Sequence, residues 1–375
     1  MDLKHCKEYL ICCLCRFTSW KNKMLPRETA CIARTAPFLR ILLFFSLVFQ
    51  AVGLHLSPPE LFAVAPMMGH TNRHWRYFFR LLSRQTWLYT EMLPATQVIA
   101  AYDSDACNAE LLRFHPIEHP IAMQIGGHDV DQLAKAAAIA ARLGYDAVNL
   151  NCGCPSNAVA GERGHGAALM REPDHVAACC EAMLQAIEAV PSEEGNLGCL
   201  VTVKHRLGIA DAKDYDPLLD LDPSLDFKTA EQFIQSVSRS GVTRMQVHAR
   251  KGLLGLHENE DLDDPGQNLA REGTKINHKR KQAKAKRRAR EITKYNRCVP
   301  PLRPGVVREL AQRFPFLELV INGGVQSLDE VESILKDITV STPESIHGVM
   351  VGRAVINHPW YVLKDFYLLQ TCSPI

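Results

Sequence analysis

The sequence contains no apolar run of about 20 residues, the length that a transmembrane helix needs. The run Ile41–Phe49, even when extended to Gly53, has only about 9–14 residues and is too short to span a membrane comfortably. Paired Cys-x-x-Cys sets are also missing, so nothing indicates a structural zinc site. These absences argue against a helical membrane protein and against a zinc-stabilised fold.

An excess of charge of either sign is missing as well. Lysine and arginine number 43 against 41 aspartate and glutamate residues, a net charge of +2 that gives no information about partners. With 375 residues and 47% apolar content, the chain is long enough for one large or two ordinary domains with a sizeable core.

The cysteines indicate a reduced protein. Five of the 13 lie within the first 31 residues, and the others are scattered. Cys152 and Cys154 are too close in sequence for an ordinary disulfide. The pattern is therefore not that of a disulfide framework.

Residues 1–57 do not look like part of a folded domain. They carry eight basic residues against three acidic ones, followed by the short apolar run and small residues. This arrangement is typical of a secretory-type leader, and Met24 would give it a better-proportioned start than Met1. The alternatives are an N-terminal membrane anchor and an error in the gene prediction.

From Leu61 onward, strand-like and helix-like segments alternate. The clearest helical periodicities lie at Val130–Leu143 and His175–Val190. Eight strands with crossover helices over about 300 residues predict a (β/α)₈ TIM barrel. The strand-like runs lie at residues 61–66, 87–92, 120–125, 145–150, 200–204, 243–248, 317–321 and 347–351.

The alternative is an open, doubly wound sheet. That fold would need no eighth strand and would usually show a glycine fingerprint after its first strand, which this sequence lacks. We therefore predict an α/β fold with the barrel at residues 58–360, preceded by the leader at 1–57.

The segment Asn149–Ser156 is the strongest candidate for a catalytic loop. Its Gly153-Cys154-Pro155 sequence cannot continue as strand or helix, so Cys154 is expected at the carboxyl end of the preceding strand. In (β/α)₈ barrels, that end carries the chemistry. The alternative interpretation is a buried structural cysteine.

Residues 257–299 interrupt the alternation with a charged insertion. An acidic stretch, Glu258 to Asp264, precedes a basic run at residues 279–290. The run is either a solvated charge run or a phosphate-binding arm at the catalytic face.

Several motifs in order, from about residue 61 to residue 360, resemble those of the tRNA-dihydrouridine synthases, flavoenzymes that reduce a uridine in transfer RNA. Phe78–Ser83 and Leu88–Met92 resemble most closely the branch that modifies D-loop positions 20 and 20a. The motifs are Ala65-Pro66-Met67, Tyr89–Met92, Met123–Gly127, Asn149–Ser156, Val201–Gly208, Val247–Lys251, Ile321–Gly324 and Gly348–Arg353.

The resemblance implies an enzyme that uses FMN, reduced by NADPH, and Cys154 as the proton donor. Reducing the uracil 5,6 double bond needs a hydride, which no side chain supplies. A thiol that stays protonated at neutral pH can donate the accompanying proton. We expect Cys152 to point the other way and to be the weaker candidate.

The resemblance also implies binding residues. Lys204 would stabilise negative charge on the reduced flavin. Glu91 is either a polar barrel residue or a flavin contact, and His248 is either a flavin ligand or a structural histidine. The implied flavin-binding residues are Pro66, Met67, Met68, Gln124, Lys204, His248, Asn322, Gly323, Gly324, Gly352 and Arg353. The implied RNA-binding residues are Asn151, Arg206, Lys294 and Arg297.

Two departures from the family pattern stand out. The loop from Pro155 to Gly166 is one residue longer, and His165 replaces an aromatic residue. The chain ends at Ile375, so we expect the family's C-terminal helical domain to be missing or truncated, with residues 361–375 as a short helix or tail.

The expected partners are tRNA and NADPH, with no stable protein partner and no functional membrane span. Because the enzyme needs RNA, the leader favours import into an organelle, a plastid rather than a mitochondrion. The alternatives are the cytoplasm and an N-terminal membrane anchor. Two alternative functions are a catalytically silent RNA- or flavin-binding paralogue and an FMN barrel oxidoreductase that acts on a small molecule.

Overall fold

The structure of the protein is a computed structural model that describes residues 58–104, 108–156, 159, 165–191, 198–255, 296, 299–339 and 346–359. All of these residues belong to one compact unit, Leu56–Ile375. The predictions for the leader, for the basic run and for a helix beyond Pro359 lie outside the described residues. Within the described ranges, no helix is long and apolar enough to cross a membrane.

Eight parallel strand positions form a ring in the order β1-β11-β10-β8-β6-β5-β4-β2. The bridge Ala63↔Trp87 closes the ring. Val64 N donates to Trp87 O at 2.9 Å, and Trp87 N donates to Phe62 O at 2.9 Å. The predicted barrel is therefore confirmed. The strands are β1 Phe62–Val64, β2 Leu88–Tyr89, β4 Ile121–Gly126, β5 Ala147–Cys152, β6 Leu200–Arg206, β8 Arg244–His248, β10 Glu318–Asn322 and β11 Gly348–Val351.

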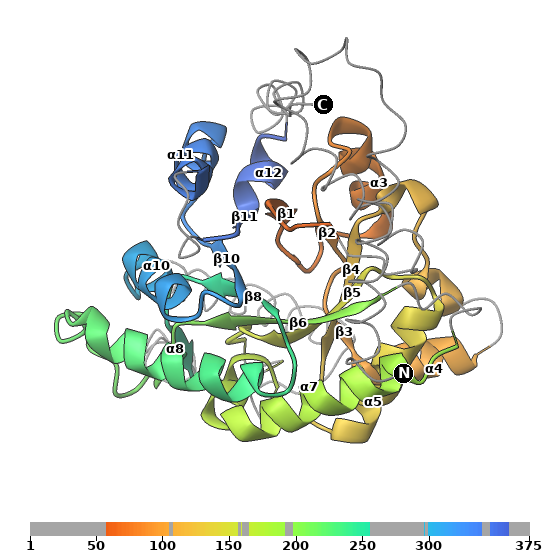
Figure 1. Ribbon diagram of the computed structural model, residues 1–375, viewed down its shortest axis with the longest axis horizontal. Helices are drawn as coiled ribbons and strands as arrows, with labels where there is room; N and C mark the ends of the chain where they lie inside the picture. The colour runs from red at the N-terminus through yellow and green to blue at the C-terminus, as the bar shows by residue number, and fades with distance from the viewer. Residues whose placement is uncertain are drawn as a thin grey trace, which may run out of the picture. The chain divides into compact units, whose positions relative to one another are not determined.

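Helices surround the strands (Figure 1). Local sequence fixes where several of them begin: Asp129 caps α5 by accepting the amide of Gln132, and Asn72 caps α3 in the same manner. Proline occupies the first turn of α7, α8 and α10. The helices are α3 Arg73–Leu82, α4 Ala95–Asp103, α5 Val130–Arg142, α7 Pro173–Glu188, α8 Pro223–Ser238, α10 Pro304–Arg313, α11 Leu328–Thr339 and α12 Arg353–Asn357.

Short elements decorate this frame. A short strand β3, Leu93–Pro94, extends the pairing with β4, and β7, Ile209–Asp211, pairs with β9, Gly252–Leu254. Three 3₁₀ helices complete the described structure: η1 Asn108–Leu112, η2 Pro116–Glu118 and η3 Gly166–Arg171.

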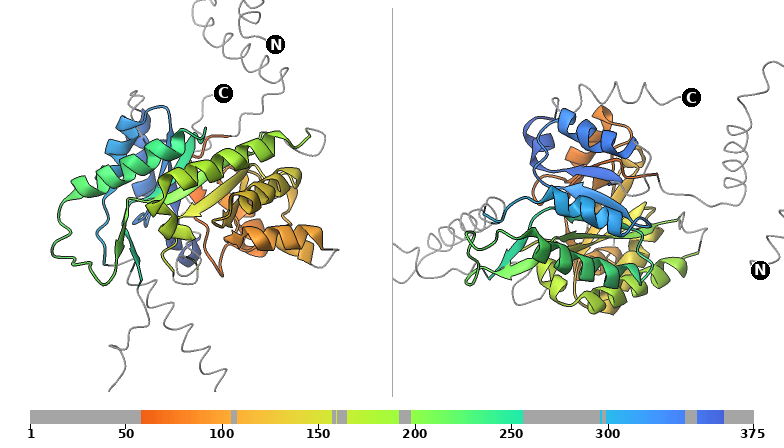
Figure 2. Two further views of the ribbon diagram at one scale, coloured as in Figure 1. Left: turned by 90° about the horizontal axis from the view of Figure 1, so that it is seen from below. Right: turned by 60° about the vertical axis from the view of Figure 1, so that its left-hand side comes forward.

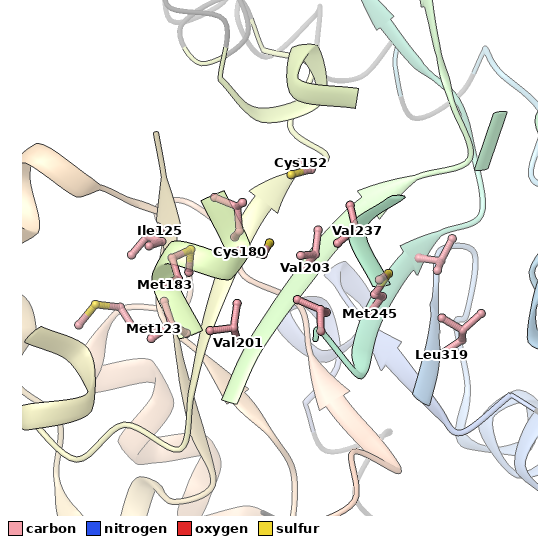
Figure 3. Packing of buried hydrophobic residues seen from close by; sticks show 14 of the residues in the cluster. Met123, Ile125, Cys152, Cys180, Met183, Val201, Val203, Val237, Met245 and Leu319 are labelled. Carbon is pink, nitrogen blue, oxygen red and sulfur yellow. The ribbon is translucent and has the colours of Figure 1, made fainter. Parts of the chain in front are cut away.

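The main core lies between the outer face of the strands and the helices. Figure 3 shows Met123 and Val203 from the strands near Cys180 and Met183 of α7, and Met245 of β8 near Val237 of α8. The neighbouring helices α7 and α8 run side by side (Figure 2). Because strand side chains alternate between faces, every second residue points into the barrel instead.

The barrel interior is unusually polar. Gln124, Asn149, Thr202 and Gln246 are each at most 3% exposed and lie on four neighbouring strands. Branched apolar residues usually fill such interiors. A separate small apolar cluster, which includes Trp87 and Tyr89, packs beside these polar residues.

Candidate active site

A cavity of about 490 Å³ lies at the carboxyl ends of the barrel strands, within the size range of small-molecule sites. The structure brings most of the predicted residues together there: Cys154, Pro66, Met67, Gln124, Asn151, Lys204, Arg206, His248, Asn322, Gly323, Gly324, Gly352 and Arg353.

One predicted residue that the structure describes, Met68, is not part of this lining. Met68 is 67% exposed and is not among the described residues that line the cavity, so its contact with the flavin stays a prediction. The backbone turns after Met68, with Gly69 at a φ of +77°. Lys294 and Arg297 lie outside the described residues.

A tight turn at the end of β5 brings Cys154 to the cavity. Asn151 Oδ1 accepts hydrogen bonds from Gly153 N at 3.0 Å and Cys154 N at 3.1 Å. Arg206 Nε donates to Gly153 O at 2.6 Å, and Arg206 Nη1 donates to Lys251 O at 2.9 Å. Asn151 and Arg206 therefore hold the cysteine loop in place.

Cys152 belongs to the hydrophobic core. It is fully buried on the outer face of β5, close to Cys180 and Met183 of α7 (Figure 3). Burial raises the pKa of its thiol well above the usual range. The two thiols point in different directions. Residues two apart in a strand share a face, and it is the turn after Cys152 that redirects Cys154.

The Cys154 thiol is suited to carry a proton at neutral pH. Burial raises its pKa, although a backbone hydrogen bond from Ser156 and the charges of Arg206 and Lys204 act in the opposite direction. A raised pKa keeps the thiol protonated and makes it a proton donor rather than a nucleophile.

Gly166 lies against the backbone of Cys154. It has a φ of +59°, and a Cβ atom there would lie 2.5 Å from the carbonyl oxygen of Cys154. The next residue, Ala167, donates its N–H to that same oxygen at 2.9 Å. Most of the longer loop that precedes His165 lies outside the described residues.

We expect Gly166→Ala to destabilise the protein by about 1–3 kcal/mol, because alanine meets both an unfavourable φ and a backbone contact. Gly305→Ala is the control: Gly305 lies in the first turn of α10, and a Cβ there meets nothing within 4 Å. Denaturant unfolding of both variants tests this, and equal stabilities would remove the constraint assigned to Gly166.

The cavity wall is cationic. Lys204, Arg206, Arg250 and Arg353 line it, whereas no aspartate or glutamate does so among the described residues. Burial, and next the neighbouring Arg206, lower the pKa of Lys204 to about 7. Burial likewise lowers the pKa of Arg206 to about 10. Burial of these positive charges is unfavourable, and an anionic ligand would offset part of that cost.

Lys204 and His248 are held differently. Lys204 Nζ donates to Asn322 Oδ1 at 2.9 Å, and Asn322 Nδ2 donates to Met350 O at 2.8 Å. Burial, followed by the charges of the nearby arginines and Lys204, lowers the pKa of His248 well below its usual range. His248 is therefore neutral in the site.

Glycines at the ends of β10 and β11 form a cradle suited to a phosphate group. Gly323 and Gly324 have φ values of +114° and +83°. A Cβ at Gly323 would lie 2.8 Å from the His248 ring, so only glycine fits there without displacement. Gly352 and Arg353 lie at the start of α12, where barrels of this type commonly bind phosphate.

The structure also places residues whose role was unassigned or left open from the sequence. Glu91 Oε1 accepts the amide of Gly69 at 2.5 Å, and Glu91 is not among the described residues that line the cavity. Arg250 lines the cavity and is nearly buried. Its place at a strand's carboxyl end, in the motif Val247–Lys251, is the signal that could have identified it.

The Asn296 side chain hydrogen-bonds to the backbone of β9 next to the cavity. Its side chain accepts from Leu253 N at 2.7 Å and donates to Leu253 O at 3.0 Å, which fixes it to β9. It also lines the cavity. Asn296 therefore links β9 to the cavity lining.

The parallel barrel, the thiol and the cationic wall at the strand ends together define a barrel enzyme with a site for an anionic ligand. The sequence model of the family described as Dihydrouridine synthase (Dus) matches residues 63–373. The chain belongs to this family of flavin oxidoreductases.

Three bacterial relatives carry the name tRNA-dihydrouridine(20/20a) synthase. The protein from Synechocystis sp. is 36% identical over 310 residues, which cover 81% of this chain and 71% of the relative. The protein from Pseudomonas putida is 35% identical, with 85% and 74% covered. The protein from Xanthomonas axonopodis pv. citri is 37% identical, with 84% and 71% covered.

Proposed function

We propose that this protein reduces uridines at positions 20 and 20a of the tRNA D-loop to 5,6-dihydrouridine, with FMN as cofactor and NADPH as reductant. The observation that carries the proposal is the Cys154 thiol, which faces the same cavity as the cationic wall. The names of the relatives support the substrate.

The residues of the cavity fit a flavin mononucleotide. The glycine cradle and Arg353 suit its phosphate, and the absence of carboxylates from the described lining suits an anionic group. Gln124, Lys204 and Asn322 would hold the polar edge of the ring system. When bound, FMN reduced by NADPH would supply the hydride that the uracil takes up.

Cys154 would donate the proton to C5 of the uracil. Asn151 and Arg206 hold its loop, and we propose that they also border the extracted base. Enzymes that act on a base must take it out of the stack and read it in a pocket. Asn151 and Arg206 would thus both position the Cys154 thiol and confine the uracil.

Absorbance and product analysis test this function. Purified protein should show a flavin spectrum, and with NADPH it should form dihydrouridine in an unmodified tRNA transcript. Mass spectrometry of the tRNA should locate the product at positions 20 and 20a. Protein that binds flavin and tRNA without forming product would instead support the silent binding paralogue.

We also propose that the basic run at residues 279–290 contributes to tRNA affinity. In the sequence the run lies between β9 and Asn296, and Asn296 lines the cavity. Deleting it should raise the Kd for tRNA at least ~10-fold and flatten the dependence of log K on log salt by about two or more units, because phosphate contacts release counterions. Filter binding at several salt concentrations measures both quantities.

A matched deletion gives the control. Removing the acidic stretch 258–264 shortens the same insertion without removing its cationic charge, so it should not weaken tRNA binding. Flavin content should be unchanged in both deletions. An unchanged Kd and salt slope without residues 279–290 would instead identify the run as a spacer or a sorting signal.

A further inference from the structure

A chain of buried polar side chains crosses the barrel interior and ends at the active-site cavity. Tyr89 OH donates to Glu60 Oε1, and Gln246 Nε2 donates to Glu60 Oε2, both at 2.8 Å. Asn149 Nδ2 donates to Gln246 Oε1 at 2.8 Å. Gln124 Nε2 donates to Asn149 Oδ1 at 2.8 Å, and Gln124 lines the cavity.

The direction of every hydrogen bond along this row of side chains follows from its first member, Glu60. An ionised carboxylate can only accept hydrogen bonds, so Gln246 must turn its NH₂ group toward Glu60. The oxygen of Gln246 then faces Asn149, which must give its own NH₂ group. The oxygen of Asn149 in turn faces Gln124, whose NH₂ group is used there. The Oε1 end of the Gln124 amide is therefore left for the cavity.

A side branch supports the same order. Asn149 Nδ2 also donates to Thr202 Oγ1 at 2.9 Å, and the Thr202 hydroxyl is itself directed at Val148 O. Both hydrogens of the Asn149 amide thus have acceptors. If the Asn149 amide group were flipped, its Oδ1 atom would face Gln246 Oε1, and two acceptors would oppose each other.

We propose that Glu60 is a positioning residue for the ligand of this site: its carboxylate fixes the orientation of three successive amides, so that Gln124 presents an oxygen and selects a ring edge that bears an N–H donor. The inference rests on the proposed flavin, whose ring system carries one such imide N–H, at N3. Glu60 acts through Gln246 and Asn149 and does not itself line the cavity.

The charges around Glu60 come from several strands. Burial raises its pKa to about 7, although Arg244 of β8 and the hydrogen bonds from Tyr89 and Gln246 act against this. Glu318 of β10 also raises the pKa of Glu60, and the charge of Glu60 partly opposes the lowering of the Lys204 pKa on β6. At pH 8 the carboxyl group is ionised, which is the state that the amide order requires.

The test compares two probes at pH 8, FMN and N3-methyl-FMN, whose ring edge has no N–H. Flavin-free protein is titrated with each probe, and the ratio of the two Kd values is the readout. The wild type should bind FMN at least ~10-fold more tightly, because the methylated ring leaves the Gln124 oxygen unpaired. In Glu60→Gln the ratio should fall to about threefold or less, since an amide at position 60 lets the chain adopt either order.

Two further variants separate positioning from general support of the fold. Tyr89→Phe removes a hydrogen bond from the same carboxylate but keeps it an acceptor, so the ratio should stay at the wild-type value. The double variant Glu60→Gln/Gln246→Glu moves the carboxylate one link toward the cavity. Glu at position 246 still accepts from Asn149, so the ratio should be restored.

The outcomes are distinguishable. Failure of the wild type to bind FMN would overturn the proposed flavin enzyme itself. Wild-type binding of both probes with equal affinity, or an unchanged ratio in Glu60→Gln, would overturn the role of Glu60 and leave the flavin assignment intact. If Glu60→Gln lost affinity equally for both probes and the double variant did not restore the ratio, Glu60 would have a purely structural role. That result would also overturn the proposal.

Discussion

Replacing Cys154 with alanine is expected to slow dihydrouridine formation about 10²–10⁴-fold, the usual scale for loss of a positioned acid. The thiol faces the cavity and is held there by the turn at Gly153. The backbone of that turn does not depend on the sulfur. Flavin content and NADPH oxidation without tRNA should therefore stay close to the wild-type values, and single-turnover assays on tRNA should locate the defect in the uridine reduction step.

Cys152→Ala is the matched control. This thiol packs on the outer face of β5 against α7, away from the cavity (Figure 3). Removing it from the core should lower stability by about 1 kcal/mol and leave the rate of uridine reduction almost unchanged. If Cys152→Ala were the inactive variant and Cys154→Ala the active one, the assignment of the proton donor would be wrong.

The barrel could be predicted from the sequence because its signal is local. Each predicted strand run overlaps an observed strand, and the helices α5 and α7 begin and end within about two residues of the predicted ranges. Alternation of short apolar runs with amphipathic segments identifies a parallel barrel without knowledge of any contact. The closure between β1 and β2 rests on a single bridge, which no local pattern shows.

The grouping of site residues at strand ends was predictable for the same reason, but their interactions were not. Asn151 was expected to contact RNA, yet its side chain shapes the cysteine loop by accepting two backbone amides. Glu60 received no role, because a single carboxylate before an apolar run has no sequence signature. Its partners Tyr89 and Gln246 lie 29 and 186 residues away. Contacts at such separations depend on the shear of the barrel, which the sequence does not display.

Lys204→Met should have the second large effect and slow NADPH oxidation by about 10²-fold or more. The substitution removes the positive charge that would stabilise the negative charge developing on the reduced flavin. Lys204 lines the cavity, and its ammonium group is oriented by Asn322. Methionine keeps the length and apolar volume of the side chain, so the cavity should keep its shape. Stopped-flow measurement of flavin reduction and titration with FMN test the prediction.

The pH dependence of flavin binding gives an independent readout of the same residue. Burial lowers the pKa of Lys204 to about 7, so the side chain is charged below that pH and loses its proton above it. A ligand that prefers the charged form raises this pKa in the complex. Its affinity should therefore be full below about pH 7 and decline as the pH rises toward the raised value. Lys204→Met should bind FMN more weakly, without this decline.

Lys135→Met is the appropriate control for Lys204. Lys135 is exposed on α5 and pairs with Asp103 at 3.3 Å on the protein surface, outside the cavity lining. The substitution removes the same charge, but at a site outside the cavity lining. Flavin reduction and the pH profile should therefore match those of the wild type. Equal effects of the two substitutions would attribute the change to net charge. An unaltered reductive reaction in Lys204→Met would remove this lysine from the flavin site, because the expected slowing depends on its charge lying close to the reduced ring.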